Sequence, residues 1–316
     1  MAKLITGGLG FIGSNLARRL VEQGEEVFLF DIVPRSKLID DIVDRVKVIQ
    51  GDLSNWAQVL DIVRKYGVDC IYHTGALLSA SAEENPLTAY MVNANGTFHI
   101  LEAARLFGVK TVMFLSTIAT YGPGLPDRVG DDTIQRPTTM YGVTKVLGER
   151  LGEYYHRKFG VNFRGIRFPS VIGPGRGHGG VSAYSTLIVQ EPAAGRLYKV
   201  FVDEETRIPL LYIKDAVQSL IQLEQADEKS LKRRVYNIEG FSPTAIELAR
   251  AVKKYLPDAR IEFCPITEMV EIARSWPREL DSRCACEDWG WETRYTLSKA
   301  IEDFVEEFRV RSHLYE

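Results

Sequence analysis

Tyr141 and Lys145 are the residues whose types and spacing best suit acid–base chemistry in this chain. They lie four apart in the segment 140–159, whose length and pattern predict a helix. Residues i and i+4 of a helix share one face, with Cβ atoms about 5–6 Å apart. A free phenol has a pKa of about 10 and is a poor base at neutral pH. We expect the neighbouring ammonium to lower that pKa, so that the phenolate can deprotonate a hydroxyl; an exposed helix pair is the alternative.

Glycines cluster in TGGLGFIG, residues 6–13, directly after a short apolar segment. The sequence contains both GxGxxG and GxxGxxG. Such glycines permit a tight turn and a close approach of the backbone to a pyrophosphate, and the following helix offers free N–H groups at its start. A glycine-rich turn without a ligand is the alternative. The candidate cofactor residues of this loop are Gly7, Gly10, Phe11, Ile12 and Gly13.

Two acidic residues lie at or just after the ends of the next two apolar segments. Asp31 lies roughly 20 residues after the loop, the separation expected for a carboxylate that accepts hydrogen bonds from the adenosine ribose. A carboxylate there repels a 2′-phosphate and favours NAD over NADP, although Arg35 nearby weakens that preference. Asp52, with Leu53 beside it, could contact the adenine amino group, and a simple turn is an equal alternative.

Apolar segments that alternate with helical ones would position these residues. Strands are expected over 3–6, 26–33, 46–49, 70–74, 111–116 and 163–169, and helices over 14–23, 56–66, 89–107 and 140–159. This pattern predicts an α/β fold with a parallel sheet covered on both faces. The alternation fades near residue 170, where a short strand pair (198–202 with 210–213), helices and a strand near 261 follow. We therefore expect a cofactor-binding domain over 1–170 and a smaller α+β substrate lobe over 171–316, from which the chain could cross back to the sheet.

Ligands collect at the carboxyl edge of a parallel sheet. Thr117 follows the fifth strand at that edge, where it could hydrogen-bond the same substrate oxygen as Tyr141. Phe168 ends the sixth strand and is a candidate for cofactor contact. With Lys145, these residues would allow a substrate hydroxyl to lose its proton while hydride leaves the same carbon for NAD⁺.

Composition excludes several other classes of protein. The chain has 316 residues, 39 Lys plus Arg and 42 Asp plus Glu, and its net charge of −3 gives no reason to expect nucleic acid or an anionic membrane as partner. Apolar residues make up 45%, which excludes wholesale disorder. No apolar run reaches membrane-spanning length and no signal peptide is evident, so we expect a cytoplasmic protein. Four cysteines are too few for a disulfide scaffold, and Cys284 and Cys286 are one residue short of a CxxC pair, so no metal is assigned.

The motifs in combination resemble those of the extended short-chain dehydrogenases, the NAD-dependent epimerase/dehydratase group. They are TGGLGFIG, the acid at 31, STIATYGP at 116–123 and YGVTK at 141–145. The resemblance covers essentially the whole chain and implies a Rossmann doubly wound sheet with a smaller C-terminal lobe. It also implies Tyr141 as catalytic base, Lys145 as its electrostatic partner and ribose ligand, and Thr117 as the third catalytic hydroxyl. A homodimer built from the helices 89–107 and 140–159 is a further implication.

Within that group, the chain is most similar to the short-chain type of L-threonine 3-dehydrogenase. The matching segments are 77–80, 116–119, 141–149, 203–212 and 275–277 through 288–291. By this resemblance Ser79 and Trp276 would face the substrate; a loop cap and plain core packing are the alternatives. The run 178–184 departs from the pattern, because Val181 replaces a threonine and Ala183 replaces an acid that would suit a substrate ammonium.

The loop after the sixth strand offers other polar groups instead. Arg176 and His178 could receive a carboxylate or hydroxyls, together with Ser182, although a surface loop is the alternative. The stretch 167–195 also resembles dehydrogenases of small sugar acids. We therefore predict an NAD-dependent oxidoreductase that acts on a secondary hydroxyl of a small polar substrate, threonine or a hydroxy or sugar acid.

Two other functions are compatible with the sequence. One is a nucleotide-sugar 4-epimerase or dehydratase with tightly bound NAD, for which Arg207 stands where such enzymes often hold a diphosphate. The other is a regulatory protein that binds NAD without turnover. The intact set of Thr117, Tyr141 and Lys145 argues against the second, since a sensor needs no base.

Overall fold

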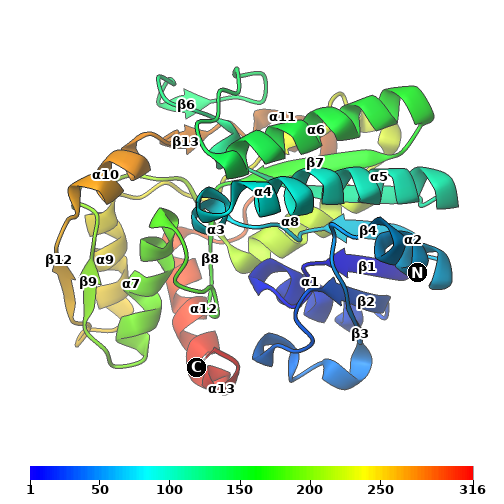
Figure 1. Cartoon of the computed structure of the whole chain (residues 1–316). Helices are drawn as coiled ribbons and strands as arrows, with labels where there is room; N and C mark the ends of the chain where they lie inside the picture. The colour runs from blue at the N-terminus through cyan, green and yellow to red at the C-terminus, as the bar shows by residue number, and fades with distance from the viewer. Residues whose placement is uncertain (316) are drawn as a thin grey trace.

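A parallel sheet of seven strands forms the centre of the molecule in the computed structural model, which describes residues 1–315 (Figure 1). Its order is β11-β7-β5-β4-β1-β2-β3, and every neighbouring pair is parallel. The strands are β1 (Ala2–Thr6), β2 (Glu26–Asp31), β3 (Lys47–Gln50), β4 (Cys70–His73), β5 (Thr111–Thr117), β7 (Phe163–Phe168) and β11 (Val235–Asn237). The chain winds outward from β1 in both directions, which confirms the predicted Rossmann doubly wound sheet.

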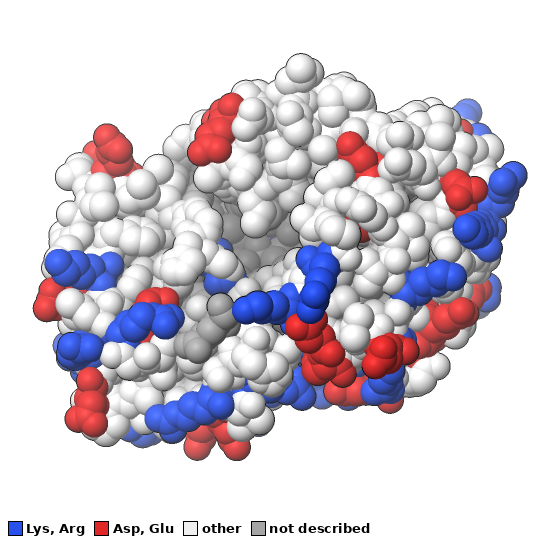
Figure 2. Space-filling view, turned by 60° about the horizontal axis from the view of Figure 1, so that its bottom comes forward, with Lys and Arg blue, Asp and Glu red and all other residues white. Residues whose placement is uncertain are grey.

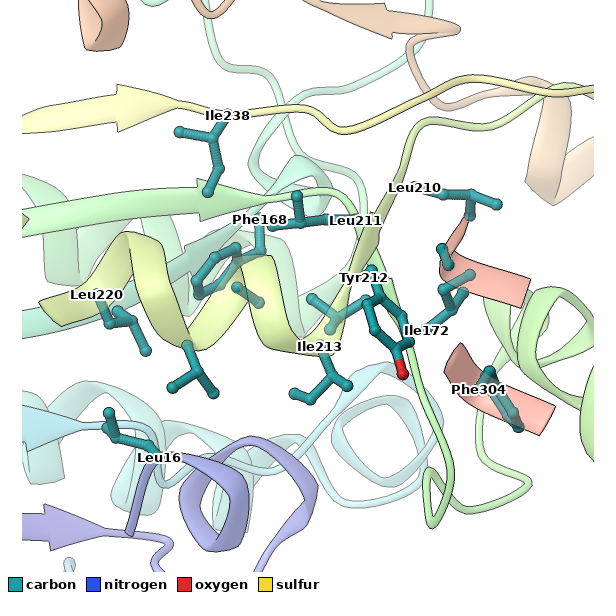
Figure 3. Close-up of a cluster of buried hydrophobic side chains, with 14 of the residues drawn as sticks. Leu16, Phe168, Ile172, Leu210, Leu211, Tyr212, Ile213, Leu220, Ile238 and Phe304 are labelled. Atoms are coloured by element: carbon teal, nitrogen blue, oxygen red, sulfur yellow. The ribbon is translucent and has the colours of Figure 1, made fainter. Parts of the chain in front are cut away.

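Helices cover both faces of this sheet. Those in contact with it or with one another include α1 (Phe11–Glu22), α2 (Trp56–Lys65), α5 (Gly96–Phe107), α6 (Met140–Phe159) and α8 (Ile213–Gln225). Successive side chains of a strand point to opposite faces, so Leu4 joins the core beneath α2 and α5 whereas Ile5 joins the core beneath α1 and α8. Figure 3 shows part of the second core, where Leu16 of α1, Leu220 of α8 and Phe168 of β7 lie in one cluster.

Two expected helices differ in their boundaries. The segment 89–107 is not one helix but α4 (Pro86–Ala89), the π-helical segment η3 (Tyr90–Asn95) and α5. Asn93 within η3 accepts a hydrogen bond from Leu77 N at 2.7 Å and donates one to Leu77 O at 3.0 Å. This tertiary pairing accompanies the widened turn, as at many functional sites. Helix α1 begins three residues early, because Gly10 is extended and its carbonyl already accepts from Ser14 N.

The C-terminal part contains three small parallel pairs rather than the expected strand pair. β9 (Tyr198–Val200) pairs with β12 (Ile261–Phe263), and β10 (Leu210–Tyr212) pairs with β8 (Ser170–Ile172). The expectation that 198–202 pairs with 210–213 is therefore wrong: each strand has a partner distant in sequence, as parallel pairs require a long crossover. β6 (Arg128–Val129) pairs with β13 (Glu279–Leu280). Between β10 and β12, the chain returns to the main sheet through β11.

The remaining short elements complete this part and the loops. The helices are α3 (Ser79–Glu84), α7 (Tyr184–Ala193), α9 (Ala245–Tyr255), α10 (Thr267–Arg274), α11 (Arg283–Trp289), α12 (Leu297–Val310) and α13 (Ser312–Tyr315). Single 3₁₀ turns are η1 (Lys37–Ile39), η2 (Val43–Arg45), η4 (Ile118–Thr120), η5 (Val181–Ala183) and η6 (Glu228–Ser230). No helix within residues 1–315 is both long and apolar enough to cross a membrane. Figure 2 shows a hollow near the middle of one face, with Lys and Arg side chains at its edge.

Candidate active site

The glycine loop forms a cradle in which side chains would not fit. Gly7 has a φ of +64° and donates its N–H to Phe30 O at 2.8 Å. A Cβ on Gly7 would lie 2.6 Å from Gly75 Cα, and one on Gly13 would lie 2.4 Å from Gly7 O. Gly10 caps α1 without a side chain, so the first N–H groups of that helix are available to a ligand. Phe11 and Ile12, both half-buried, form the first turn.

Asp31 is tied to this loop. Its carboxylate accepts from Leu9 N at 3.0 Å and from Val33 N at 3.3 Å, and the residue is half-buried. Each carboxylate oxygen can accept more than one hydrogen bond, so the group remains able to receive ribose hydroxyls. Its second task, to hold the glycine loop beside β2, was not evident from the sequence. The glycine cradle and the free N–H groups at the start of α1 suit a pyrophosphate, and Asp31 suits a ribose. Together they fit a dinucleotide.

Asp52 and Leu53 lie in the turn after β3. Asp52 Oδ1 accepts from Ser54 N at 2.8 Å, which is the turn that the sequence left as one of two alternatives. Leu53 is buried, and its Cδ1 atom would lie 2.8 Å from a Cβ placed on Gly75. Leu53 and Gly7 therefore both border Gly75, so the structure brings this turn next to the glycine cradle.

Tyr141 and Thr117 meet where α6 begins beside the end of β5. Thr139 caps the helix and accepts from Gly142 N at 3.1 Å. A Cβ on Gly142 would lie 2.1 Å from Ala119 O, so only glycine lets the helix start approach this closely. The Thr117 hydroxyl lies near enough to the Tyr141 phenol to favour its ionised form. Phe168 lies opposite Thr117 in the β5–β7 register, which places it at the same edge of the sheet.

The electrostatics of this cluster differ from expectation. Burial raises the pKa of Tyr141 to about 12, and the neighbouring Thr117 hydroxyl only partly opposes this rise. The expected lowering is therefore wrong for the protein chain by itself. Lys145 Nζ donates to Leu115 O at 2.7 Å and lies 5.7 Å from the Tyr141 ring centre, and its hydrogen bond is to this backbone oxygen rather than to the phenol. Burial also lowers the pKa of Lys145 to about 7, although Glu149 opposes this.

Glu149 continues the face that carries Tyr141 and Lys145 and was not singled out from the sequence. It is fully buried, accepts from Ser116 Oγ at 2.5 Å, and receives Arg167 Nε and Nη2 at 2.9 and 2.8 Å. Burial raises the pKa of this carboxyl, but the Arg167 hydrogen bonds and charge outweigh it and lower the pKa overall. The spacing of four residues after Lys145 was the sequence signal that could have identified it.

A second missed residue is Asn93, whose amide fixes the loop after β4. Besides its two bonds to Leu77, Nδ2 donates to Thr144 Oγ1 at 3.2 Å, which connects η3 to α6. Leu77 leads into α3, whose first residue is the half-buried Ser79. The structure thus anchors the segment that carries Ser79 to the helix that carries Tyr141.

The remaining candidate substrate residues are only partly brought together. Arg176 Nη2 donates to Ser182 Oγ at 2.7 Å, whereas His178 between them is exposed. Trp276 is half-buried and packs against a small apolar cluster that contains Ile118, the residue directly after Thr117. Arg207, considered for a diphosphate, instead donates to Ser242 O and lies 3.5 Å from Glu247 Oε2. Over residues 1–315, no group of three or more His, Cys, Asp or Glu side chains could hold a metal ion.

Comparisons with known proteins agree with this geometry. The model of the NAD dependent epimerase/dehydratase family matches residues 3–238. Mitochondrial L-threonine 3-dehydrogenase of Bos taurus is 34% identical over 305 residues, which cover 94% of this chain and 80% of that protein. The X-ray structure of an L-threonine dehydrogenase from Clostridium difficile has a TM-score of 0.91 and 37% identity, with 98% of both chains covered. A monomeric L-threonine 3-dehydrogenase from a metagenome, in its apo form, has a TM-score of 0.90 and 29% identity, and the match covers 98% of this chain and 99% of that one.

The family model spans the sheet, the glycine cradle and the Thr117–Tyr141–Lys145 cluster. The relatives extend the match over nearly the whole chain. The chain therefore belongs to the NAD dependent epimerase/dehydratase family and is an NAD-dependent oxidoreductase.

Proposed function

We propose that this protein is a dehydrogenase that oxidises a secondary hydroxyl of a small polar substrate to a ketone and reduces NAD⁺ to free NADH. The observation that carries the proposal is the position of Thr117 beside Tyr141, with Lys145 one helical turn further, at the carboxyl end of β5 and so on the sheet edge that also carries the glycine cradle. Ligands of open α/β sheets bind at that edge.

We assign NAD binding to the residues of the glycine cradle and to those next to it. The backbone of Gly7, Gly10, Phe11, Ile12 and Gly13 would hold the pyrophosphate and Asp31 the adenosine ribose. Asp52 and Leu53 would border the adenine, and Tyr141, Lys145 and Phe168 the nicotinamide end. When bound, NAD⁺ supplies the acceptor for a hydride.

Proton transfer is assigned to the phenol of Tyr141. With a pKa of about 12 in the chain alone, it needs added positive charge nearby before it can act as a base at neutral pH. Lys145 supplies part of that charge in its protonated form, and its pKa of about 7 places its titration in the working range. Thr117 would hydrogen-bond the same substrate oxygen and hold it beside the phenol.

The substrate is proposed to be L-threonine or a small hydroxy acid. The names of the relatives support threonine, and the polar groups at positions 79, 176 and 182 support any small substrate with hydroxyl and carboxylate groups. Ser79, Arg176, His178, Ser182 and Trp276 are the residues proposed to contact it. The alanine at 183 favours substrates without an ammonium group.

Tyr141→Phe tests the proposal directly. We expect purified wild-type protein to form free NADH from NAD⁺ with at least one member of a panel of L-threonine, four-carbon hydroxy acids and sugar acids. The variant should lose about a hundredfold to ten-thousandfold in rate, the range for a general base, while its affinity for NADH changes little. Tyr154→Phe, an exposed tyrosine of the same helix, is the matched control and should keep full activity.

Two results would contradict the proposal. Conversion of a nucleotide sugar to its epimer without net NADH would make the protein an epimerase. Thermal stabilisation by NAD⁺ without turnover of any panel member would favour a regulatory protein, since a ligand that binds the native state raises its apparent stability.

A homodimer and a cytoplasmic location complete the proposal. Apolar side chains remain exposed along η3, α5 and α6, which contact one another: Tyr90, Met91, Phe98, Leu106, Phe107, Val143, Leu147, Tyr154 and Phe159. A second copy of these helices would cover them, as expected for a patch of this extent. The free thiols, among them exposed Cys264 and Cys286, suit a reducing compartment, which cell fractionation would test.

A further inference from the structure

The loop after β8 packs against the first turn of the helix that follows the glycine cradle. A Cβ on Gly173 would lie 3.0 Å from Phe11 Cζ, so this residue contacts the first turn of α1. A Cβ on Gly175 would lie 2.8 Å from Leu38 Cδ2, which belongs to the connection between β2 and β3. The segment 173–176 is therefore packed against the two elements that follow the cradle and the Asp31 strand, and also against Ile213 of α8 and Tyr315 of α13.

A tight turn fixes the position of Arg176 in that loop. Arg176 N approaches Gly173 O at 3.5 Å, with Pro174 and Gly175 between them, and Gly175 has a φ of +84°. Proline followed by a glycine of positive φ is typical of a type II turn, which leaves little freedom for the residue after it. The Arg176 side chain consequently starts from a defined place beside α1.

The guanidinium of Arg176 is bound by Ser182, one of the candidate substrate residues. Nη2 donates to Ser182 Oγ at 2.7 Å, and Ser182 O accepts from Ser185 Oγ at 2.8 Å. Ser170 Oγ approaches the same carbonyl at 3.5 Å and lies two residues after Phe168, which is opposite Thr117 in the sheet. The backbone of Arg176 is thus close to the helix that follows the glycine cradle, and its guanidinium is held by Ser182, whose carbonyl is near Ser170 at the start of β8.

One nitrogen of this guanidinium lacks a partner. Nη1 of Arg176 is buried and has no hydrogen bond to any of residues 1–315. Burial lowers the pKa of Arg176 to about 10, so the group stays protonated at neutral pH. None of the ion pairs formed by the described residues includes Arg176, although a buried cation is normally paired. The donor without a partner and the unpaired charge both indicate that Arg176 binds an anion that is not among residues 1–315.

We propose that Arg176 is the oxyanion-binding residue of this site, with Nη1 as the donor to a phosphate or carboxylate oxygen of a bound molecule. Arginine presents a planar fork of donors that suits either group. Two sources carry this chemistry: the pyrophosphate of the dinucleotide, and the carboxylate of a hydroxy-acid or amino-acid substrate. The second source rests on the proposed function, and the first does not.

Binding measurements without turnover separate the two sources. ADP carries a diphosphate but neither nicotinamide nor carboxylate, so its affinity, measured by calorimetry, probes the pyrophosphate source. Binding of 3-hydroxybutyrate to the NADH-saturated protein, compared with uncharged 1,3-butanediol, probes the carboxylate source. Arg176→Gln should weaken one of these two anions about tenfold to a hundredfold, the worth of a hydrogen bond to a charged group, and leave 1,3-butanediol unaffected. Arg176→Lys should recover part of the loss, because it keeps the charge but not the fork.

Control variants distinguish a specific loss of anion binding from a general folding defect. Arg157→Gln removes an exposed arginine from the last turn of α6, far along the helix from Tyr141, and should leave both affinities unchanged. Ser182→Ala removes the group that anchors the guanidinium and should weaken the same anion as Arg176→Gln, by a smaller factor. Unchanged ADP and carboxylate affinities in Arg176→Gln would overturn the proposal, as would equal losses for charged and uncharged ligands. If wild-type protein binds no carboxylate, the proposed substrate class fails and the ADP measurement alone decides.

Discussion

Lys145 combines burial, a single backbone hydrogen bond and a pKa of about 7, and this combination makes the stability of the protein depend on pH. Its pKa is lowered in the folded state from the ordinary 10.5. Between these two pH values the unfolded lysine is protonated and the folded one is not, so the unfolded state binds more protons and stability rises with pH. The lysine therefore opposes folding most at pH 7 and below, and that penalty disappears as pH approaches 10.5.

We expect Lys145→Met to remove this dependence. The wild type should gain up to about 1.4 kcal/mol of unfolding free energy per pH unit from this residue between pH 7.5 and 9.5, and the variant should lack that part of the slope. Urea unfolding of both proteins across this range measures it, with Lys158→Met on the exposed end of the same helix as control. Parallel slopes in wild type and Lys145→Met would mean that the lysine keeps its ordinary pKa in the fold.

The sequence predicted which residues lie at the candidate site better than it predicted the pKa values of those residues. The positions of the glycines, Asp31, Thr117, Tyr141 and Lys145 at one edge of a parallel sheet could be predicted from the order of strands and helices, while their catalytic and binding roles stay predictions. The direction of the Tyr141 pKa depends on which atoms surround the phenol, and no spacing encodes that. For the same reason the pairing of Glu149 with Arg167, from two separate elements, appears only in the folded chain.

At the scale of elements, local signals determined which boundaries could be predicted. Helix α6 was placed correctly because its own sequence carries both ends: Thr139 caps the start and Gly160, with a φ of +73°, ends it. The segment 89–107 was misjudged because its π-helical turn accompanies the contact of Asn93 with Leu77, which lies 16 residues earlier. Of the strands after residue 170, those at 198–202, 210–213 and near 261 were predicted, whereas β11 and β13 were missed. The predicted pairing of 198–202 with 210–213 was wrong, since pairing at long range leaves no local pattern.

The start of α6 offers a test of how strictly one element positions the site. Gly142→Ala would put a Cβ 2.1 Å from Ala119 O, so the helix must move away from the end of β5. We expect a loss of about 1–3 kcal/mol in stability, as for other overpacked contacts, and a fall in activity larger than that destabilisation explains, because Tyr141 moves away from Thr117. Unfolding and steady-state rates measure both effects. Gly130→Ala, where an added Cβ has open space, is the matched control, and equal activity in the two variants would contradict the argument.

At the scale of the whole molecule, the exposed apolar side chains on η3, α5 and α6 remain to be accounted for. This exposed apolar face is adjacent to the catalytic helix, since α6 presents Tyr141 and Lys145 toward the sheet while Val143, Leu147 and Tyr154 point outward. A single helix thus serves the site on one face and offers a surface for a second copy on the other. In a two-fold dimer, the same surface of both copies is in contact, so one set of apolar residues would be buried on each subunit.

Leu147→Glu tests that assembly. Leu147 is 37% exposed in the single chain, and a charge there would be costly inside an apolar contact between two copies. We expect the wild type to have twice the chain mass by light scattering after size exclusion and the variant to be monomeric, with unchanged affinity for NADH. Val310→Glu, at a residue 71% exposed on α12 and outside the face, should remain dimeric. The metagenomic relative described as monomeric shows that this fold does not require a partner, so a monomeric wild type would refute the dimer without touching the assignment of the active site.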